Sequence, residues 1–302
     1  MRVFVTGASG HIGSAVIPEL LQAGHEVVGL ARSDASAAAV TNLGAAVHRG
    51  DLDDLDGLRE AASTADGVIH LAFNHDAIRT GDFEAAAAGD LAAIHALAEP
   101  LAGTDKALVG TSGTAMLARL GLDRAGTEED VIDGGYRIDA ENTVIALADR
   151  GVRSSVVRLP PVVHSSLDKH GFVPTLIAGA RAAGRSGYMG DGANRWPAGH
   201  TVDAARLYRL ALEDAPAGSR LHAVGDDGIP LRQIAGAIAR HLGVPAASIP
   251  AEEAEAQFGW LASFVAVDNP ASSVHTQQLL DWKPTHPGLI ADLDEGHYFA
   301  TT

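Results

Sequence analysis

Short apolar runs alternate with alanine-rich stretches of helical length through the first half of the chain. The apolar runs, typical of buried strands, lie at residues 2–7, 25–32, 45–52, 67–73, 106–113 and 153–163. The helical stretches cover residues 11–24, 33–44, 54–64, 83–98 and 137–151. The first two end in glycine, a common helix terminator. This alternation predicts βαβ units, and the fold class that follows is α/β: a doubly wound parallel (Rossmann) sheet with helices on both faces.

The alternation loosens after residue 163. Helical patterns cover residues 171–184, 201–215, 231–243 and 251–266, and a strand-like run covers residues 219–227. No long Gly/Ser linker separates the two halves. We predict a dinucleotide-binding Rossmann domain over residues 1–163 and a smaller, mainly helical substrate lobe over residues 164–302. The chain is expected to cross back to the sheet around residues 195–225.

Composition narrows the classes of partner and site. The formal net charge of −16 argues against nucleic acid and membranes as partners, because both repel an acidic surface. The chain has no cysteine, which excludes disulfides and thiolate nucleophiles. Its histidines include no pair at the H-x-x-x-H spacing, so we predict no metal site. The N-terminus lacks the apolar stretch of a signal peptide and no run is long enough to span a membrane, so a cytoplasmic protein is expected.

A glycine-rich turn, VTGASGHIG, joins the first strand to the first helix. It places Gly7, Gly10 and Gly13 where a dinucleotide-binding turn needs a tight bend and close backbone approach to a pyrophosphate. The start of the following helix offers N–H groups and the positive end of its dipole to phosphate. Glycines alone are a weak signal. Their position between strand and helix, followed by repeated βαβ units, predicts nucleotide binding.

The spacing G-x-x-G-x-x-G, with the motifs RGDLDD, VIHLA and VVRLPPVV, resembles the extended and atypical short-chain dehydrogenase/reductase superfamily. The resemblance covers most of the chain. It implies a nicotinamide cofactor and a small-molecule substrate, and a homodimer is common among such proteins. It also places Asp51 beside the adenine and His70 beside the ribose and nicotinamide, with a loop cap and a polar strand end as the respective alternatives. The implied cofactor contacts are Thr6, Gly7, Ser9, Gly10, His11, Ile12, Gly13, Arg32, Ser33, Asp51, Leu52, His70, Leu71, Ala72, Arg137 and Pro160.

The end of the second strand decides between the two nicotinamide cofactors. NAD sites place a carboxylate there for the ribose hydroxyls, whereas NADP sites place an arginine for the 2′-phosphate. Alignment with the superfamily puts Ala31 in the acidic position, followed by Arg32 and Ser33. Asp34 comes later and is expected to cap the next helix. A guanidinium without a competing carboxylate favours NADP(H) over NAD(H).

The segment VIDGGYRIDAENTV, residues 131–144, lies where the superfamily carries a tyrosine followed four residues later by a lysine. In that pair the cation lowers the pKa of the phenol, so that it can exchange a proton near neutral pH. Here Tyr136 is followed at that distance by Ala140, so the pair is missing. One alignment puts Asp133 and Arg137 in the tyrosine and lysine positions. A one-turn slip puts Arg137 and Glu141 there instead.

Other polar residues remain as candidates for the reaction. The superfamily's serine position after the fifth strand falls on Gly113, which two hydroxyl residues flank. A histidine follows the sixth strand at the carboxyl edge of the sheet, where its pKa suits proton transfer, with a structural imidazole as the alternative. Arginine can hold ribose hydroxyls but cannot lose a proton near neutral pH. The candidate catalytic residues are Ser112, Thr114, Tyr136, Arg137 and His164.

Residues 194–200, NRWPAGH, are rich in Gly and Pro and are predicted to form a turn that borders the substrate. Aromatic residues of the second half can line an apolar pocket, although such residues more often belong to a core. They are Phe172, Tyr188, Trp196 and Trp260.

The framework predicts an NADP(H)-dependent oxidoreductase that transfers hydride between the nicotinamide and a small ketone, aldehyde or imine. One alternative is an NADP(H)-binding regulator or redox sensor without turnover, which the missing pair supports. Another is a nucleotide-sugar epimerase or dehydratase, which normally relies on the tyrosine as a base.

Overall fold

A computed structural model describes residues 1–74, 82–135 and 137–300 and contains a seven-stranded sheet. The strand order is β10-β6-β5-β4-β1-β2-β3, and every neighbouring pair is parallel. The predicted doubly wound α/β fold is confirmed. The order reverses at β1 and β4, and ligands of such sheets bind beside the carboxyl ends of strands at this point. The strands are β1 (Arg2–Thr6), β2 (Glu26–Ala31), β3 (Ala46–Arg49), β4 (Gly67–His70), β5 (Ala107–Gly113), β6 (Arg153–Leu159) and β10 (Ser219–His222).

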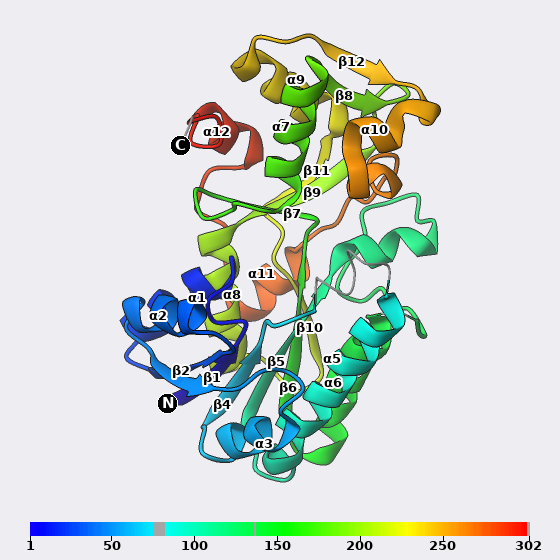
Figure 1. Ribbon diagram of the computed structural model, residues 1–302. Coiled ribbons are helices and arrows are strands. Elements are labelled where there is room, and N and C mark those ends of the chain that lie inside the picture. The colour runs from blue at the N-terminus through cyan, green and yellow to red at the C-terminus, as the bar shows by residue number, and fades with distance from the viewer. Residues whose placement is uncertain (75–81, 136, 301–302) are drawn as a thin grey trace.

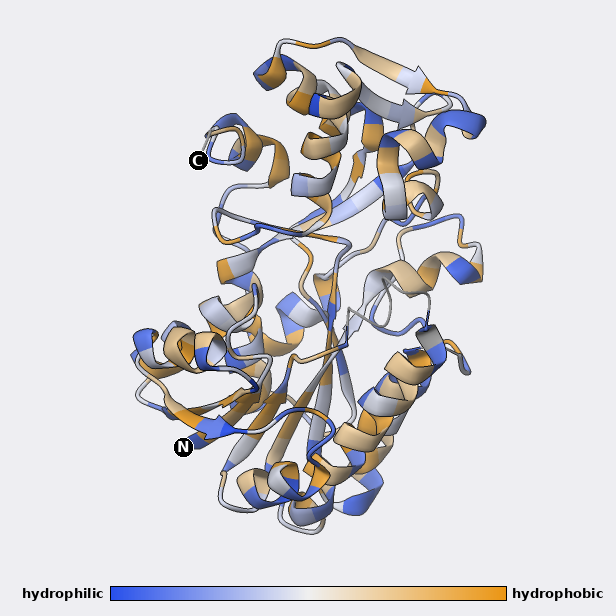
Figure 2. Cartoon of the chain, in the orientation of Figure 1, coloured by the Kyte–Doolittle hydropathy of each residue, from blue (hydrophilic) through white to orange (hydrophobic). Residues whose placement is uncertain are grey.

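Helices cover both faces of the sheet, as Figure 1 shows. Each face has its own buried apolar cluster; one includes residues of α1, α2 and α8, and the other includes residues of α3, α5 and α6. In Figure 2 the hydrophobic colour runs along the strands of the main sheet and along parts of the helices that flank it. None of the described helices is both long and apolar enough to cross a lipid bilayer. The helices are α1 (Gly13–Gln22), α2 (Asp34–Asn42), α3 (Leu55–Ser63), α5 (Phe83–Ala98), α6 (Ile138–Ala146) and α8 (Thr201–Asp214).

The second half of the chain returns to the sheet through α8 and β10. Helix α8 packs against α1 and brings Leu207 and Tyr208 into the core of that face, where both are fully buried. Strand β10 then pairs in parallel with β6 at the sheet edge. The sheet layer therefore contains residues from both halves of the chain.

The remaining elements form a separate lobe with its own core. It contains helices and two small sheets, ordered β11-β9-β7 and β12-β8, above the carboxyl edge of the main sheet in Figure 1. The largest buried side chain of its core is Trp196. Its elements are β7 (Val162–His164), α7 (Phe172–Ala183), β8 (Ser186–Met189), β9 (Arg195–His200), β11 (Asp226–Pro230), α9 (Leu231–Leu242), β12 (Ala246–Ile249), α10 (Ala254–Phe258) and α12 (Leu289–Asp294); α11 (Val274–Leu280) packs instead against β10 and α8.

Three local expectations were wrong. Residues 153–163 form two strands in different sheets, β6 and β7, because Pro160 and Pro161 cannot donate to a strand ladder. The segment predicted as a turn, residues 194–200, is the central strand β9 of the small sheet. Residues 251–266 do not form one helix, because Gly259, with φ of +55°, ends α10 and a short 3₁₀ segment follows.

Candidate functional site

The glycine-rich turn packs directly against the backbone that follows β4. Gly7 has φ of +66°, and a Cβ placed on it would lie 2.7 Å from the amide nitrogen of Ala72. A Cβ on Gly13 would lie 2.3 Å from the carbonyl oxygen of Gly7. Both contacts are too short for any side chain, so glycine is required for the turn to approach β4 and for α1 to approach the turn.

The outer side of this turn is open and fits the pyrophosphate of a dinucleotide. Ser9 and Gly10 are exposed, and a Cβ on Gly10 would meet only the carbonyl oxygen of Gly7, at 3.2 Å. Helix α1 starts after Ile12 without a side-chain cap and without an acidic residue in its first turn. The amides of Ser14 and Ala15 already donate to the carbonyls of Gly10 and Ile12, at 2.9 and 3.0 Å, so it is the uncompensated positive end of the helix dipole that is available to an anion.

A buried hydrogen-bond chain fixes the carboxyl ends of β1 and β4. The hydroxyl of Thr6 lies 2.7 Å from Nδ1 of His70, and the Nε2 of His70 lies 3.1 Å from the carboxylate of Asp90 on α5. The Thr6 oxygen also accepts from the amides of Leu71 and Ala72, both at 3.2 Å. These bonds fit together when His70 carries its proton on Nε2 and Thr6 donates to Nδ1. Sequence reasoning missed Asp90, since nothing in its own helix marks it.

A further contact joins the turn to the second half of the chain. His11, in the turn, has Nε2 at 2.8 Å from the hydroxyl of Thr201 at the start of α8. Burial lowers the pKa of His11, although the carboxylate of Asp168 opposes the shift. Pro160 is buried after β6, where a Cβ on Gly199 of β9 would lie 3.3 Å from its ring.

The end of β2 places Arg32 and Ser33 on the surface before α2. Ser33 is the N-cap of α2, and its hydroxyl accepts from the amide of Ser36 at 3.2 Å. The expectation that Asp34 caps this helix was wrong; Asp34 is its first residue and forms an ion pair with Arg49 at the end of β3. Ser33 is therefore held in place by its capping hydrogen bond, and Asp34 is held by the guanidinium of Arg49.

After β3, Asp51 organises the turn before α3. Its carboxylate accepts from the amides of Asp53 and Asp54, at 3.0 and 3.1 Å, which is the loop-cap alternative for this residue. Leu52 packs against the core cluster that contains α3. Contact with an adenine is compatible with these positions and stays a prediction.

The end of β5 carries two buried hydroxyls, those of Ser112 and Thr114, and among the described residues that of Thr114 has no hydrogen-bond partner. The Ser112 hydroxyl lies close enough to the Glu141 carboxylate to lower the pKa of that group. The exposed fractions of Ser112 and Thr114 are 4% and 0%. Leaving a buried hydroxyl unpaired costs about 1–3 kcal/mol, so such groups at a sheet's carboxyl edge are typical of a site that awaits a polar ligand. With its amide oriented for hydrogen bonding, Asn269 donates to the carbonyl of Thr114 at 3.0 Å and accepts from the amide of Ala115 at 3.3 Å.

Arg137 brings a permanent cation to the carboxyl ends of β4 and β5. It precedes α6 in the left-handed conformation, with φ of +60°. Its Nη2 lies 3.3 Å from the carbonyl oxygen of Thr111 on β5, and its guanidinium carbon lies 3.9 Å from the ring centre of Phe73, just beyond β4. The structure therefore brings Arg137 to the same strand end as Ser112 and Thr114. Tyr136 lies outside the described residues.

Behind Arg137, α6 is tied to the sheet by a buried ion-pair network. Glu141 accepts from Arg158 on β6 at 2.6 Å and from Arg220 on β10 at 2.8 Å. Burial alone would raise the pKa of Glu141, but the two guanidiniums hold it below its usual value. Arg158 also donates to His222 at 3.2 Å, and burial lowers the pKa of His222 to about 4. Neither proposed alignment predicted these partners.

His164 is part of a histidine group in the lobe, away from open solvent. It is fully buried at the end of β7; its Nδ1 donates to Asp292 at 2.8 Å, while Nε2 has no partner among the residues that the structure describes. Its ring meets that of His200 edge-on, with centroids 5.4 Å apart. Burial lowers the pKa of His200 to about 4, and the nearby His164 and His286 add to the shift. The hydrogen bond of His164 to Asp292 and its ring contact with His200, both inside the lobe, favour the structural alternative over proton transfer to a substrate.

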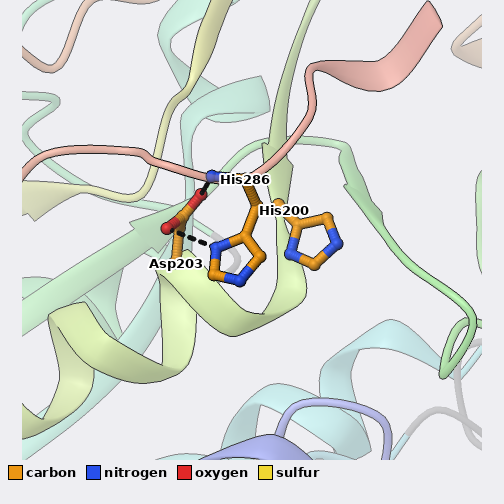
Figure 3. Close-up of side chains that lie close together, drawn as sticks. All are labelled: His200, Asp203 and His286. Carbon is orange, nitrogen blue, oxygen red and sulfur yellow. Dashed lines mark hydrogen bonds and ion pairs between the residues drawn. The ribbon is translucent and has the colours of Figure 1, made fainter. Parts of the chain in front are cut away.

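His200, Asp203 and His286 come together at the start of α8, as Figure 3 shows. The rings of His200 and His286 are stacked, with centroids 4.5 Å apart and an angle of 7° between their planes, so their in-plane lone pairs cannot converge on one ion. The carboxylate of Asp203 already accepts from Nδ1 and the amide of His286, at 2.9 and 3.0 Å. These hydrogen bonds indicate a structural role, in which Asp203 holds residues 285–286 against α8. The absence of a metal site stays a prediction.

Comparisons with known proteins agree with this arrangement of turn and sheet. The model of the NAD dependent epimerase/dehydratase family matches residues 3–224. An uncharacterized protein of Schizosaccharomyces pombe is 48% identical over 99% of this chain and 100% of its own length. The 2'-dehydrokanamycin reductase of Streptomyces kanamyceticus is 30% identical, covering 93% of this chain and 78% of its own. The structure of a UDP-glucuronic acid 4-epimerase from Bacillus cereus with UDP-glucuronic acid and NAD is similar, with a TM-score of 0.75, 18% identity and coverage of 99% and 98%.

Proposed function

The chain belongs to the NAD dependent epimerase/dehydratase family, and from that premise we propose that it is an NADP(H)-dependent reductase of a small ketone, aldehyde or imine. Its membership makes it an NAD(P)-dependent oxidoreductase of the short-chain dehydrogenase/reductase type. One observation carries the finer proposal. Beside an intact dinucleotide turn, two buried hydroxyls and a fixed guanidinium lie at one strand end, where a polar C=X group can be held.

The residues at this strand end have separable roles in the proposal. A bound nicotinamide cofactor supplies the hydride that reduces the substrate carbon. Ser112 and Thr114 offer hydroxyls that hold the substrate oxygen. Arg137 holds ribose hydroxyls and places positive charge where negative charge develops on that oxygen. Because a guanidinium does not release its proton near neutral pH, the proton for the oxygen comes from Tyr136 or from ordered water.

The first test is turnover. The protein is mixed with NADPH and a panel of ketones, aldehydes and imines, and absorbance of the reduced nicotinamide is followed. We expect oxidation with at least one member of the panel. Tight NADPH binding without oxidation by any substrate would favour the regulator, which the missing tyrosine–lysine pair supports. Conversion of a nucleotide sugar without net cofactor oxidation would favour the epimerase.

Replacing Arg32 tests the choice of cofactor. In Arg32→Ala, the dissociation constant of NADPH is expected to rise about 10- to 100-fold, because a charge-assisted arginine–phosphate contact contributes about 1.5–3 kcal/mol. The constant for NADH should change less than about threefold, since NADH has no 2′-phosphate. Titration of both cofactors by fluorescence measures this difference. A wild-type preference for NADH would contradict the assignment.

Tyr136 is the first candidate for the proton donor. If it fills that role, Tyr136→Phe lowers turnover about 10²–10⁴-fold, the usual range for an acid–base group, with little change in cofactor affinity. Tyr188→Phe, in strand β8 of the lobe, is the matched control and should turn over like the wild type. An unchanged rate in Tyr136→Phe would move the role to Ser112, Thr114 or water.

A further inference from the structure

The lobe carries three aromatic side chains that meet edge-on and remain partly in water. Ring centres are 5.1 Å apart for Phe172 and Trp260, 5.6 Å for Phe172 and Phe264, and 6.2 Å for Trp260 and Phe264. Trp260 is 52% exposed and Phe264 is 37% exposed. We call these three residues the aromatic face. Large apolar side chains that gather in water mark a binding surface more often than single exposed ones do.

The aromatic face packs against the core of the lobe. Phe172 is the first residue of α7 and also meets the ring of Trp196, with centres 5.5 Å apart. Trp196 is 2% exposed, and its indole nitrogen donates to the carbonyl of Val267 at 3.2 Å. A surface held in this way loses little conformational entropy when it binds a ligand.

The aromatic face is connected to the hydroxyls of the proposed site through a short segment. A turn closes from the amide of Val267 to the carbonyl of Phe264 at 2.9 Å. Two residues later, the side chain of Asn269 hydrogen-bonds to the backbone of Thr114 and Ala115. A turn spans under about 7 Å and two extended residues add about 7 Å, so Phe264 and Asn269 lie within about 14 Å.

From this continuity we propose that the aromatic face binds the apolar part of the substrate, an aryl or branched alkyl group on the carbonyl. This inference rests on the proposed function, with the substrate oxygen at Ser112 and Thr114. A nucleotide diphosphate would instead need cations close to the rings. Arg185 and Arg195 of the lobe are each engaged by a carboxylate, of Glu253 and Asp268 respectively, so their charge is compensated. The exposed Lys169, three residues before Phe172, leaves one permanent cation for the two charges of a diphosphate, which favours an apolar group.

Tryptophan fluorescence tests the binding without requiring turnover. The chain has three tryptophans, and only Trp260 among them is exposed; Trp196 and Trp282 are 2% and 0% exposed. Quenching by acrylamide therefore reports on Trp260. We expect millimolar benzyl alcohol, added to the protein with NADP⁺, to lower the quenching constant at least about twofold, and ethanol and UDP to leave it unchanged. Absence of protection by benzyl alcohol, or stronger protection by UDP, would overturn the proposal.

Kinetics separate this inference from the proposed function. Trp260→Ala is expected to raise KM for phenylacetaldehyde about tenfold, the effect of losing about 1.4 kcal/mol of aromatic contact, and to leave KM for acetaldehyde within about twofold. Trp260→Phe, which keeps a ring, should behave nearly like the wild type. Equal changes for both aldehydes would refute the aromatic face and leave the reductase standing. Protection by benzyl alcohol, together with no oxidation of NADPH by either aldehyde or by any other member of the panel, would refute the reductase and leave the aromatic face standing.

Discussion

Gly13→Ala is expected to abolish cofactor binding at ordinary concentrations, with the dissociation constant of NADPH raised about 100-fold or more. A Cβ at this position would lie 2.3 Å from the carbonyl oxygen of Gly7 and 2.6 Å from that of Ala8, both of which are backbone atoms. Relief of the clash must shift α1 away from the turn. Two charge-assisted bonds to the pyrophosphate lost in this way correspond to about 3 kcal/mol, or about 100-fold. Overpacking also lowers the free energy of unfolding by about 1–3 kcal/mol.

Gly236→Ala is the matched control for this substitution. Gly236 lies inside α9, and a Cβ placed on it would meet no atom within 4 Å. Alanine should stabilise the helix there by about 0.5–1 kcal/mol and leave cofactor affinity unchanged. Titration with NADPH and urea unfolding of both variants measure the two effects. Wild-type affinity in Gly13→Ala would show that the turn does not bind the cofactor.

The sequence predicted the main sheet because its signals are local. Each buried strand is an apolar run of its own, and glycines such as Gly24 and Gly44 end the helices between them, so strand and helix can be recognised without knowledge of their neighbours. The glycine turn is local as well, since Gly7 and Gly13 lie in one strand–turn–helix unit. A wrong expectation such as the turn at residues 194–200 has the opposite cause. Strand β9 is held by β7 and β11, and tertiary pairing overrides its Gly- and Pro-rich composition.

Much of the candidate site could not be predicted because its contacts join distant positions. Asp292 accepts a hydrogen bond from His164, 128 residues earlier in the chain. Asn269 hydrogen-bonds to Thr114, which is also distant in sequence. No local pattern marks such partners. One signal was available in the sequence: Arg158 stands inside the apolar run VVRLPP, and a charge in a buried strand needs a buried counter-charge. That reasoning would have predicted an acidic partner without identifying Glu141.

Removing Glu141 should cost more stability than any other single charge change considered for this chain. In Glu141→Ala, we expect the free energy of unfolding to fall by about 3–5 kcal/mol, because the Arg158 guanidinium, 3% exposed, would be left buried without its counter-charge. Because α6 follows Arg137 directly, cofactor affinity should fall as well. Urea unfolding at pH 7 measures the first effect. Asp294→Ala removes an exposed ion pair with Arg240 and should leave the unfolding midpoint nearly unchanged.

The pH dependence of the free energy of unfolding shows whether the charge of Glu141, rather than its packing, stabilises the fold. Burial is the largest single influence on the pKa of Glu141 and raises it, but Arg158 and Arg220 together lower it by more. The pKa is therefore lowered on folding. The stability from its carboxylate is therefore fully present above the unfolded pKa, about 4.5, and is lost as the pH falls through the lower folded value. Glu141→Gln keeps the shape and one acceptor but not the charge. The stability difference between wild type and Glu141→Gln should be constant from pH 6 to 8 and should narrow below about pH 4.5. A difference independent of pH down to acid unfolding would assign the role to packing instead.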